Sequence, residues 1–566
     1  SSFLGDLYLV HLRVPESIGT EKAISILKNN PNVEYAEPNY IYKIMETIPN
    51  DPYFPKLWSL KNTGQTGGKP GADIKATLAW DIFTGSPEVV VAVIDTGIDY
   101  NHEDLAQNIW INTNEIPNNN IDDDGNGYVD DYRGWNFVNN NKNPMDDNSH
   151  GTHVSGVIGA KGNNFLGIVG VCWNIKLMPL KAGDRDGYFK DSNIVKAIDY
   201  AWRSGAKISN NSYGGYVYSQ AIFDAISRAH GSGHLFIAAA GNERNDNDKN
   251  PPYPASYRIP NIISVLATDD NDTLAGYSNY GATNVHVGAP GGADDPNMEK
   301  WIFSTILANY YGFKSGTSMA APYVTGVAAL FWGKCLPYVN HNQVKRRILE
   351  KVDVLPSLNG KCVSNGRVNA YKVLYDPTPP NSPSNLSGYS TGWTTINLSW
   401  SDNSADEIGF KIERKLPGMS DYAYIKATEA NQTSSFDEMA QGGEVNYYRV
   451  KSWNMAGDSE PCLEIGVLIP ATVPTAPTGL IARWDWGTRS VSLRWNDLSN
   501  NELEFVIERK AEWETQWTAI DSVSQNQNFY YDKNVSGDTF YYYRIKASNP
   551  VGYSYSEVVE IYIPIY

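Results

Sequence analysis

The stretch Val89–Gly97 reads VVVAVIDTG and decides the fold class. An apolar run that is followed at once by Asp, Thr and Gly predicts a buried strand that ends in a polar turn. Three further apolar runs follow it, and helical patterns separate them. The strands are expected at 89–94, 175–181, 234–240 and 262–267, and the helices near 151–160, 192–204 and 217–231. This alternation predicts an α/β fold, in which helices cover a parallel sheet.

The composition is that of a globular protein with several domains. At 566 residues the chain exceeds one domain and predicts roughly three to five. Apolar residues make up 41% and charged residues 19%, which excludes a disordered chain. The net charge of −17 argues against nucleic-acid binding through a basic surface. No run of about 18 apolar residues occurs, so no membrane span is expected.

The four cysteines are Cys172, Cys335, Cys362 and Cys462. They form no CxxC pair, which argues against a structural zinc site. Cys172 lies in the apolar run GIVGVC and is expected to be a buried free thiol. Cys335 and Cys362 are 27 residues apart in one segment, and they are the candidates for a disulfide if the protein is exported.

Both ends of the chain differ from the central α/β pattern, which spans residues 46–375. Residues 1–45 predict a strand at 7–13, an amphipathic helix at 20–29 and a second strand at 33–43. After Tyr375, the Pro-rich stretch DPTPPNSPSNL predicts a linker.

Beyond this linker the sequence repeats itself with a spacing of 95 residues. INLSWSDNSADEIGFKIERK (396–415) aligns with VSLRWNDLSNNELEFVIERK (491–510), and NYYRVKSWNMAG (446–457) aligns with YYYRIKASNPVG (541–552). Short alternating strands rich in Trp, Tyr, Val and Ile predict two β-sandwiches, at 381–470 and 474–566. Trp400 and Trp495 are the expected core tryptophans. Each unit resembles a fibronectin type III domain.

Four short motifs carry residues suited to chemistry, and each has a plainer explanation by itself. Asp95 follows a strand, where a turn acid is common. His150 opens a helix in HGTHVSG; with His153 it has the i, i+3 spacing of a metal pair, although no third ligand of the HExxH type follows. Asn242 follows a strand in AAAGN, as turn residues do. Ser318 lies in the first turn of a helix in SGTSMAAP, where a serine can be a cap.

Together, these four residues are the set that acyl transfer needs. In an open α/β sheet the carboxyl ends of the strands line the active crevice, where Asp95 and Asn242 would lie. Ser318 would attack a carbonyl, and His150 would take its proton and pass it to the leaving amine. Asp95 would orient His150. Asn242 and the Ser318 backbone N–H would donate hydrogen bonds to the tetrahedral oxyanion.

The motifs VIDTG, HGTHVSG, AAAGN and GTSMAAP, in the order Asp–His–Asn–Ser, closely resemble the subtilisin-like serine proteases. The resemblance covers about residues 50–375 and reaches into 1–45. It implies a seven-stranded parallel sheet, endopeptidase activity on protein or peptide substrates, and a secreted or other extracytoplasmic location.

The same resemblance implies that NSYGG (211–215) pairs with the substrate backbone as an added strand. The pocket for the residue before the cut would then lie between two short segments. These are Ser212, Tyr213 and Gly214 on one side and Ala239, Ala240 and Gly241 on the other. Glu243 would stand on the rim of this pocket, unless it is only a solvated loop acid.

An acidic loop, NNNIDDDGNGYVDDYRG (118–134), separates Asp95 from His150. Its spacing resembles a truncated calcium loop of the EF-hand type, in which Arg133 stands where the closing Glu would be. The expected calcium ligands are Asp122, Asp124, Asn126, the Tyr128 carbonyl, Asp130 and Asp131. The alternative is a solvated acidic turn without an ion.

A second calcium site is implied only by a resemblance to thermitase-like subtilases. Its ligands would be Asp51, Asp104, the Asn164 side chain and the carbonyls of Lys161, Leu166 and Ile168. Both ions would stabilise the fold and take no part in catalysis.

The stretch YIYKIMETIPNDPYF (40–54) joins the N-terminal segment to the α/β region. NVEYAEPNY (32–40) resembles the last strand of a subtilase propeptide, and TIPNDPYF resembles a thermitase-type mature N-terminus. The resemblance implies that residues 1–45 are a propeptide that assists folding and inhibits the enzyme. It also implies that the protease cuts its own chain near Met45–Glu46. The alternative is a plain linker.

Two other functions stay open at this point. One is a zymogen that its bound propeptide keeps inactive. The other is a binding or adhesion protein, in which the sandwiches hold a polymer or cell-surface ligand and the α/β domain is a scaffold. The intact set of four residues argues against the scaffold, because a scaffold needs none of those side chains.

Overall fold

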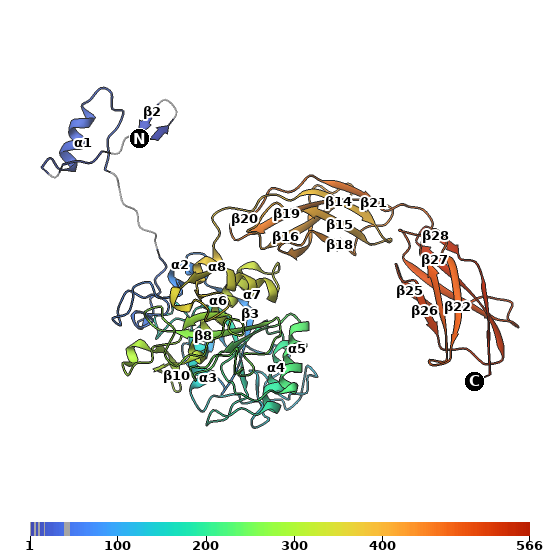
Figure 1. Ribbon diagram of the computed structural model, residues 1–566, viewed down its shortest axis with the longest axis horizontal. Helices are drawn as coiled ribbons and strands as arrows, with labels where there is room; N and C mark the ends of the chain where they lie inside the picture. The colour runs from blue at the N-terminus through green and yellow to red at the C-terminus, as the bar shows by residue number, and fades with distance from the viewer. Residues whose placement is uncertain (1, 5–6, 10–11, 16, 39–45, 566) are drawn as a thin grey trace. The chain divides into compact units, whose positions relative to one another are not determined.

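The protein is described by a computed structural model that covers residues 2–4, 7–9, 12–15, 17–38 and 46–565 (Figure 1). The chain divides into two compact units, Ser1–Thr47 and Ile48–Tyr566.

The N-terminal unit contains a short hairpin and one helix. Strands β1 (Ser2–Leu4) and β2 (Leu7–Leu9) pair antiparallel, and α1 spans Thr20–Lys28. The predicted helix is confirmed. The predicted strand at 33–43 is wrong for residues 33–38, which are irregular, and its remainder lies outside the described residues. A segment this small buries little apolar surface of its own, and no residue of α1 is buried.

A nine-stranded sheet organises the large unit, in the order β12–β13–β9–β8–β7–β6–β3–β5–β4. Its strands are β3 (Gly85–Asp95), β4 (Trp135–Asn136), β5 (Asn174–Lys181), β6 (Ile208–Asn211), β7 (Leu235–Ala239), β8 (Ile262–Thr268), β9 (Val287–Pro290), β12 (Val352–Val354) and β13 (Gly366–Val368). The seven strands from β9 to β4 are parallel, as the sequence resemblance implies. β13 and the antiparallel β12 extend the sheet.

Helices cover both faces of this sheet, because neighbouring residues of each strand point to opposite sides. Val91 and Val93 of β3 pack in one buried cluster with α3 and α6, while Ala92 and Ile94 pack in another with α4 and α5. The helices are α2 (Ala76–Trp80), α3 (His150–Gly159), α4 (Asp191–Arg203), α5 (Gln220–Gly231), α6 (Thr317–Cys335), α7 (His341–Glu350) and α8 (Ala370–Leu374). The hairpin β10 (Ile302–Ile306)–β11 (Tyr310–Lys314) adjoins α3.

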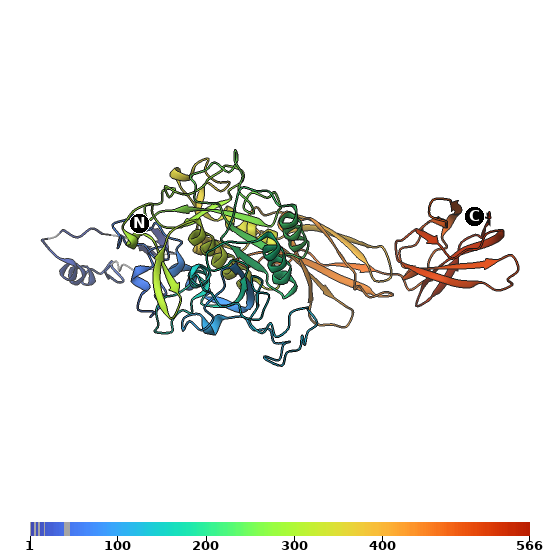
Figure 2. The ribbon, with the colours of Figure 1, turned by 90° about the horizontal axis from the view of Figure 1, so that it is seen from below.

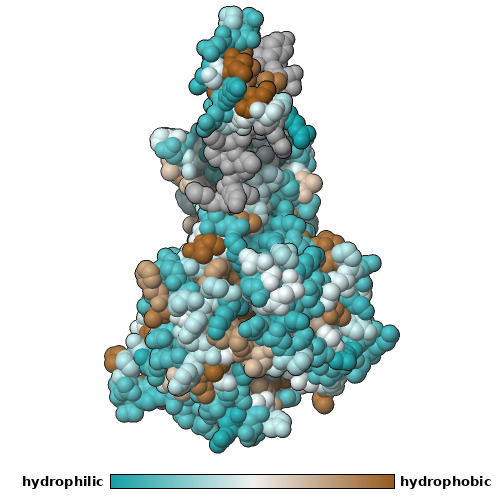
Figure 3. All heavy atoms as spheres, turned by 90° about the vertical axis from the view of Figure 1, so that its left-hand side faces the viewer, coloured by the Kyte–Doolittle hydropathy of each residue, from teal (hydrophilic) through white to brown (hydrophobic). Residues whose placement is uncertain are grey.

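The helix α6 is buried along almost its whole length, which its apolar sequence on all sides explains. No helix within the described residues has both the length and the apolar character that crossing a bilayer requires. The face shown in Figure 3 is mainly hydrophilic, and its hydrophobic residues lie singly or in small groups, as is usual for globular proteins.

Residues 384–468 and 478–563, termed here the first and second sandwich, each form two antiparallel sheets (Figures 1 and 2). The first contains β14 (Ser384–Ser390), β15 (Ile396–Ser401), β16 (Gly409–Lys415), β17 (Ala423–Glu429), β18 (Ser434–Asp437), β19 (Val445–Asn454), β20 (Gly457–Asp458) and β21 (Ile465–Leu468). The second contains β22 (Thr478–Asp485), β23 (Ser490–Asn496), β24 (Glu504–Ala511), β25 (Thr518–Ser524), β26 (Phe529–Asp532), β27 (Thr539–Asn549), β28 (Gly552–Tyr555) and β29 (Val559–Ile563). Trp400 and Trp495 are buried in the two cores, as predicted.

The 95-residue repeat also appears in the buried polar contacts. In the first sandwich, Asp437 accepts hydrogen bonds from Arg414 at 2.7 Å and Tyr448 at 2.8 Å. The second sandwich reproduces both contacts, at the same distances, 95 residues further on, with Asp532 as the acceptor. The two sandwiches therefore share one topology and one internal polar group.

The disulfide candidate is wrong. All four cysteines are free and buried. Cys335 packs at the end of α6 in the main core, and Cys362 belongs to a different hydrophobic cluster. Proximity in sequence gave no information about which cluster each thiol would join.

Candidate active site

The structure places Asp95 and His150 in direct contact. Asp95 ends β3 and is fully buried, and its Oδ1 accepts hydrogen bonds from His150 Nδ1 and from the Thr96 N–H, both at 2.7 Å. Asp95 Oδ2 is buried and has no hydrogen-bond partner within the described residues. Burial of the imidazole disfavours its charged form, but the Asp95 carboxylate outweighs burial and raises the pKa of His150. The contact leaves Nε2 as the nitrogen that can accept a proton.

Hydrogen bonds around Asp146 hold the start of α3 against the end of β3. Asp146 Oδ1 accepts from the Thr96 hydroxyl at 2.9 Å, and Oδ2 accepts from the Thr152 N–H at 2.9 Å and hydroxyl at 2.6 Å. The Gly151 N–H donates to the Thr96 hydroxyl at 3.0 Å. A Cβ at Gly151 would lie 2.1 Å from the Gly97 carbonyl oxygen, so only glycine fits beside His150.

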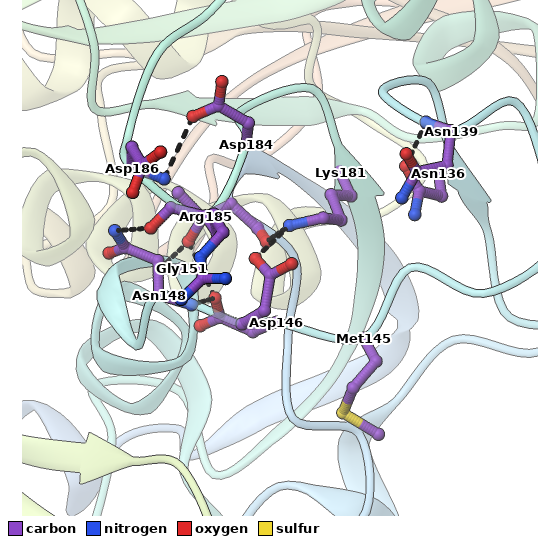
Figure 4. A network of polar contacts seen from close by, with 12 residues as sticks. Asn136, Asn139, Met145, Asp146, Asn148, Gly151, Lys181, Asp184, Arg185 and Asp186 are labelled. Carbon is purple, nitrogen blue, oxygen red and sulfur yellow. Dashed lines mark hydrogen bonds and ion pairs between the residues drawn. The ribbon is translucent and has the colours of Figure 1, made fainter.

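Three further contacts connect this region with β5 and the loop after it (Figure 4). Lys181 ends β5 and is 1% exposed. Its Nζ donates to the Thr96 carbonyl at 2.7 Å and pairs with Asp147 at 2.6 Å. The Asn148 side chain donates to the Arg185 carbonyl at 2.9 Å. The backbone on both sides of His150 is thereby fixed by side chains from separate elements.

Ser318 lies in the first turn of α6, and Asn242 contacts the residue before it, Thr317. The Ser318 hydroxyl donates to the Ser212 carbonyl at 3.2 Å, and the Ser212 hydroxyl donates to the Ser318 carbonyl at 3.0 Å. Asn242 Oδ1 accepts from the Thr317 N–H at 2.8 Å and hydroxyl at 3.0 Å, which leaves its Nδ2 available as a donor. Because β3, β6 and β7 are neighbours, the segments after their carboxyl ends bring Asp95, Ser212 and Asn242 to one edge.

A groove of about 480 Å³ opens beside His150. Ser212, Tyr213 and Gly214, the residues expected to bind substrate, line it, whereas Ala239, Ala240 and Gly241 lie outside its lining. Phe189 stacks on Tyr213 with ring centroids 4.6 Å apart, and Tyr253 closes another side. Phe189 and Tyr253 were not among the predicted substrate-binding residues, because neither adjoins a catalytic motif.

Asp51 and Asp104, expected at one calcium site, lie close together and are 3% and 0% exposed. The loop 161–168 wraps around them: Asn163 and Asn164 donate backbone N–H bonds to Asp51, and the Asn164 side chain donates to Asp104 at 2.8 Å. Ile168 donates its N–H to Asp104, and the Lys161 N–H bonds the Asp104 carbonyl. Burial raises the pKa of Asp51, and the Asp104 charge adds to this. The structure brings together Asp51, Asp104 and the predicted loop.

The acidic loop brings together a different set from the one expected. Carboxylate oxygens of Glu115, Asp124 and Asp131 lie within 4.8 Å of one another. Glu115, which the sequence analysis missed, is 4% exposed, and its Oε2 has no hydrogen-bond partner within the described residues. The signal for it was an acid seven residues before Asp122 in NEIPNNNID.

The other expected ligands of this loop lie outside this cluster and form other contacts. Asp122 accepts backbone N–H bonds from Asn126 and Gly127, and Asp130 forms an ion pair with Lys142 at 2.8 Å. The Asn126 side chain donates to Asp131 at 2.8 Å, and the Tyr128 ring packs against the core. The ligand roles expected of Asp122, Asn126, the Tyr128 carbonyl and Asp130 stay predictions.

Fold and site together define a serine protease of the subtilisin type. A family model described as the subtilase family matches residues 86–389, and one described as the fervidolysin N-terminal prodomain matches residues 4–39. The chain belongs to the subtilase family. It is a subtilisin-like serine endopeptidase with an N-terminal prodomain.

Several proteases are similar to this chain. A thermophilic serine proteinase of Bacillus sp. (strain AK1) is 37% identical over 355 residues, which are 62% of this chain and 76% of the relative. Thermitase of Thermoactinomyces vulgaris is 34% identical over 326 residues, 58% of this chain and 99% of thermitase. A solved protease from Pseudoalteromonas arctica PAMC 21717 is 31% identical, covers 58% of this chain and 98% of its own, and has a TM-score of 0.46.

Replacing Asp95 with Asn should lower kcat by about 10⁴-fold. The amide favours the wrong tautomer of His150 and has no charge with which to stabilise the imidazolium. Steady-state kinetics on a chromogenic peptide measure this. Asp224→Asn is the control, since Asp224 is exposed on α5 and accepts a hydrogen bond from Gln220, not from His150. It should retain most of its activity. A loss below tenfold in Asp95→Asn would contradict the role of Asp95.

The pH profile of kcat/KM should fall on the acid side, because only the neutral His150 ring accepts a proton. The positive charge of Lys314 lowers the pKa of His150. Lys314→Met should therefore raise that pKa and move the acid limb to higher pH. Lys249→Met, on an exposed side chain, should leave the limb in place. A limb that moves to lower pH in Lys314→Met would refute the assignment of this limb to His150.

Proposed function

We propose that Ser318, His150 and Asp95 hydrolyse peptide bonds through an acyl-enzyme. The supporting observation is the Asp95–His150 hydrogen bond of 2.7 Å at the edge where Ser318 and Asn242 also lie. The Ser318 hydroxyl rotates from the Ser212 carbonyl to His150 Nε2, which takes the proton as Oγ attacks the scissile carbonyl carbon. Catalytic hydrogen bonds often form only when substrate is bound.

The oxyanion of the tetrahedral intermediate receives hydrogen bonds from Asn242 Nδ2 and from the Ser318 N–H. Loss of one such donor costs about 2.7–4 kcal/mol of transition-state stabilisation. His150 then gives its proton to the leaving amine, and the C–N bond breaks. Water attacks the ester in the second half of the cycle, with His150 again taking and returning one proton, and Ser318 is regenerated. Asp95 stays ionised throughout and stabilises the imidazolium.

The substrate is an extended segment of a protein or peptide. The segment Ser212, Tyr213 and Gly214 follows β6 and offers its backbone to the substrate as a neighbouring strand. The groove beside it takes side chains on the acyl side of the cut, and its aromatic lining favours apolar ones. The segment Ala239, Ala240 and Gly241 lies outside the lining of this groove. It would flank the residue before the cut on the side opposite Ser212.

Calcium ions stabilise the α/β domain at two sites. The first is held by Asp51, Asp104, Asn164 and the carbonyls of Lys161, Leu166 and Ile168. The second is held by Glu115, Asp124 and Asp131, and other oxygen atoms of the acidic loop complete its coordination. The residues fit a hard cation: two acids are buried together at the first site, and Glu115 Oε2 is buried without a partner at the second. Buried carboxylates without a cation are costly.

Calcium removal should lower the Tm of the Ser318→Ala protein, because an ion that binds only the folded state at 100 times its Kd adds about 2.7 kcal/mol. Differential scanning calorimetry with calcium and with EGTA measures this. Asp104→Asn and Glu115→Gln should each reduce the calcium-dependent shift. Asp248→Asn, on an exposed acid, is the control. Equal Tm values with and without calcium would exclude both ions.

The prodomain is removed by the enzyme itself. The bond lies near Met45–Glu46; Met45 lies outside the described residues, and Glu46 begins the next described segment. The cut leaves a short N-terminal tail before Asp51, a ligand of the first calcium site. The protein is secreted, and its two sandwiches are fibronectin type III-like modules in tandem.

N-terminal sequencing and intact mass of the purified protein test self-processing. The wild type should lose about 45 residues, and Ser318→Ala should stay intact. The cut is expected from the resemblance to subtilase propeptides, which assist folding and inhibit the enzyme. Ser315→Ala is a control in the same segment and should be processed. An intact wild type, or a cut in the Ser318→Ala protein purified alone, would contradict self-cleavage.

A further inference from the structure

The first sandwich shares a hydrophobic core with the α/β domain. Ile408 and Trp453 are 2% and 4% exposed and belong to the same buried cluster as Val344 and Ile348 of α7. The interior of the first sandwich is a separate cluster around Trp400, and neither Ile408 nor Trp453 is part of it. These two side chains therefore fill the core of the protease and not the core of their own sandwich.

Polar side chains of α7 bind the same edge of the first sandwich. The Gln343 amide donates to the carbonyls of Ile408 at 3.1 Å and Thr428 at 3.4 Å, and Gln343 is 4% exposed. Arg346 donates to the Ile408 carbonyl at 3.2 Å. These bonds satisfy backbone carbonyls at the end of a sheet, where pairing partners would otherwise be lacking.

Contacts also reach the end of α6, the helix that carries Ser318 at its other end. Cys335 Sγ lies 3.5 Å from Met455 Sδ. Just beyond the helix, the Tyr338 ring lies 6.0 Å from the Trp453 ring, and Lys411 Nζ lies 4.3 Å above Tyr338. The first sandwich thus covers both α7 and the carboxyl end of α6.

The second sandwich offers an internal comparison, because its residues follow those of the first at a spacing of 95. The backbone pairing is the same: the Ile408 N–H bonds the Trp453 carbonyl at 2.8 Å, and the Leu503 N–H bonds the Ser548 carbonyl at 2.7 Å. The apolar pair is only half preserved, and the half that remains is not buried. Ser548 stands in place of Trp453, and Leu503 is 43% exposed where Ile408 is buried.

The contacts between the two sandwiches are accordingly polar. The Trp393 N–H donates to the Glu502 carbonyl at 2.8 Å, and the Gln525 amide donates to the Thr394 hydroxyl at 3.3 Å. The cluster in the first sandwich draws on residues 386–469 alone, and the cluster in the second on residues 480–563 alone. Among the described residues, only the first sandwich therefore shares a core with the domain before it.

We propose that the first sandwich is a structural part of the protease, whose function is to stabilise the α/β domain by completing its core over α7 and the end of α6. The second sandwich lacks the side chains for this task. This inference goes beyond the catalytic function and does not depend on it, because it concerns stability and can be tested on inactive protein.

The test uses the full chain with Ser318→Ala, which prevents self-digestion. Ile408→Ala should lower the Tm of the α/β transition by about 2–5 °C, since a buried apolar contact is lost. It should also speed amide hydrogen exchange in residues 341–350 by about tenfold. Leu503→Ala, at the equivalent position of the second sandwich, is the matched control and should change neither quantity.

Gln343→Ala provides a second variant on the protease side and should act in the same direction as Ile408→Ala. Equal effects of Ile408→Ala and Leu503→Ala on the Tm, with unchanged exchange in residues 341–350, would overturn the proposal. So would a calorimetric transition of the first sandwich that is separate from that of the α/β domain.

Discussion

The site depends on one buried contact, the hydrogen bond between Asp95 and His150. Its two residues are 55 positions apart, and the sheet supplies the geometry: β3 ends at Asp95, and α3 begins at His150. Gly151 permits the close approach of helix and strand, and Asp146 holds both ends in register. A carboxylate buried this deeply is stabilised by a cation, and the imidazole that contacts Asp95 becomes one in the transition state.

The proposed calcium sites follow the same physical rule, that buried charge must be compensated. Asp51 and Asp104 lie together in the interior, and the segment that begins at Ile48 is fastened to the loop 161–168 by the Asp51 contacts and by the Tyr53 N–H bond to the Gly167 carbonyl at 2.8 Å. A chain cut near residue 45 keeps all of these contacts. The mature enzyme would therefore retain its first calcium site after the prodomain is lost.

The sequence predicted the parts of this molecule that depend on local pattern. The apolar runs and helical stretches of the α/β domain fell in the right places, and the repeat of 95 residues located two sandwiches of one topology. What it missed depends on contacts distant along the chain. Glu115 reaches the acidic cluster through the fold of its loop, and Cys335 and Cys362 join different clusters although they share a segment. The role of Trp453 shows the same limit: its position in the repeat predicts a sandwich residue, and only the structure places it in the protease core.

The most direct test of the account is covalent labelling of Ser318 by a fluorophosphonate, with intact mass and peptide mapping. The account predicts a single adduct on Ser318, much slower labelling in Asp95→Asn and none in His150→Ala over the same period, because the hydroxyl is a nucleophile only when His150 takes its proton. An adduct on another residue, or labelling of Ser318 at the same rate in all three proteins, would contradict it.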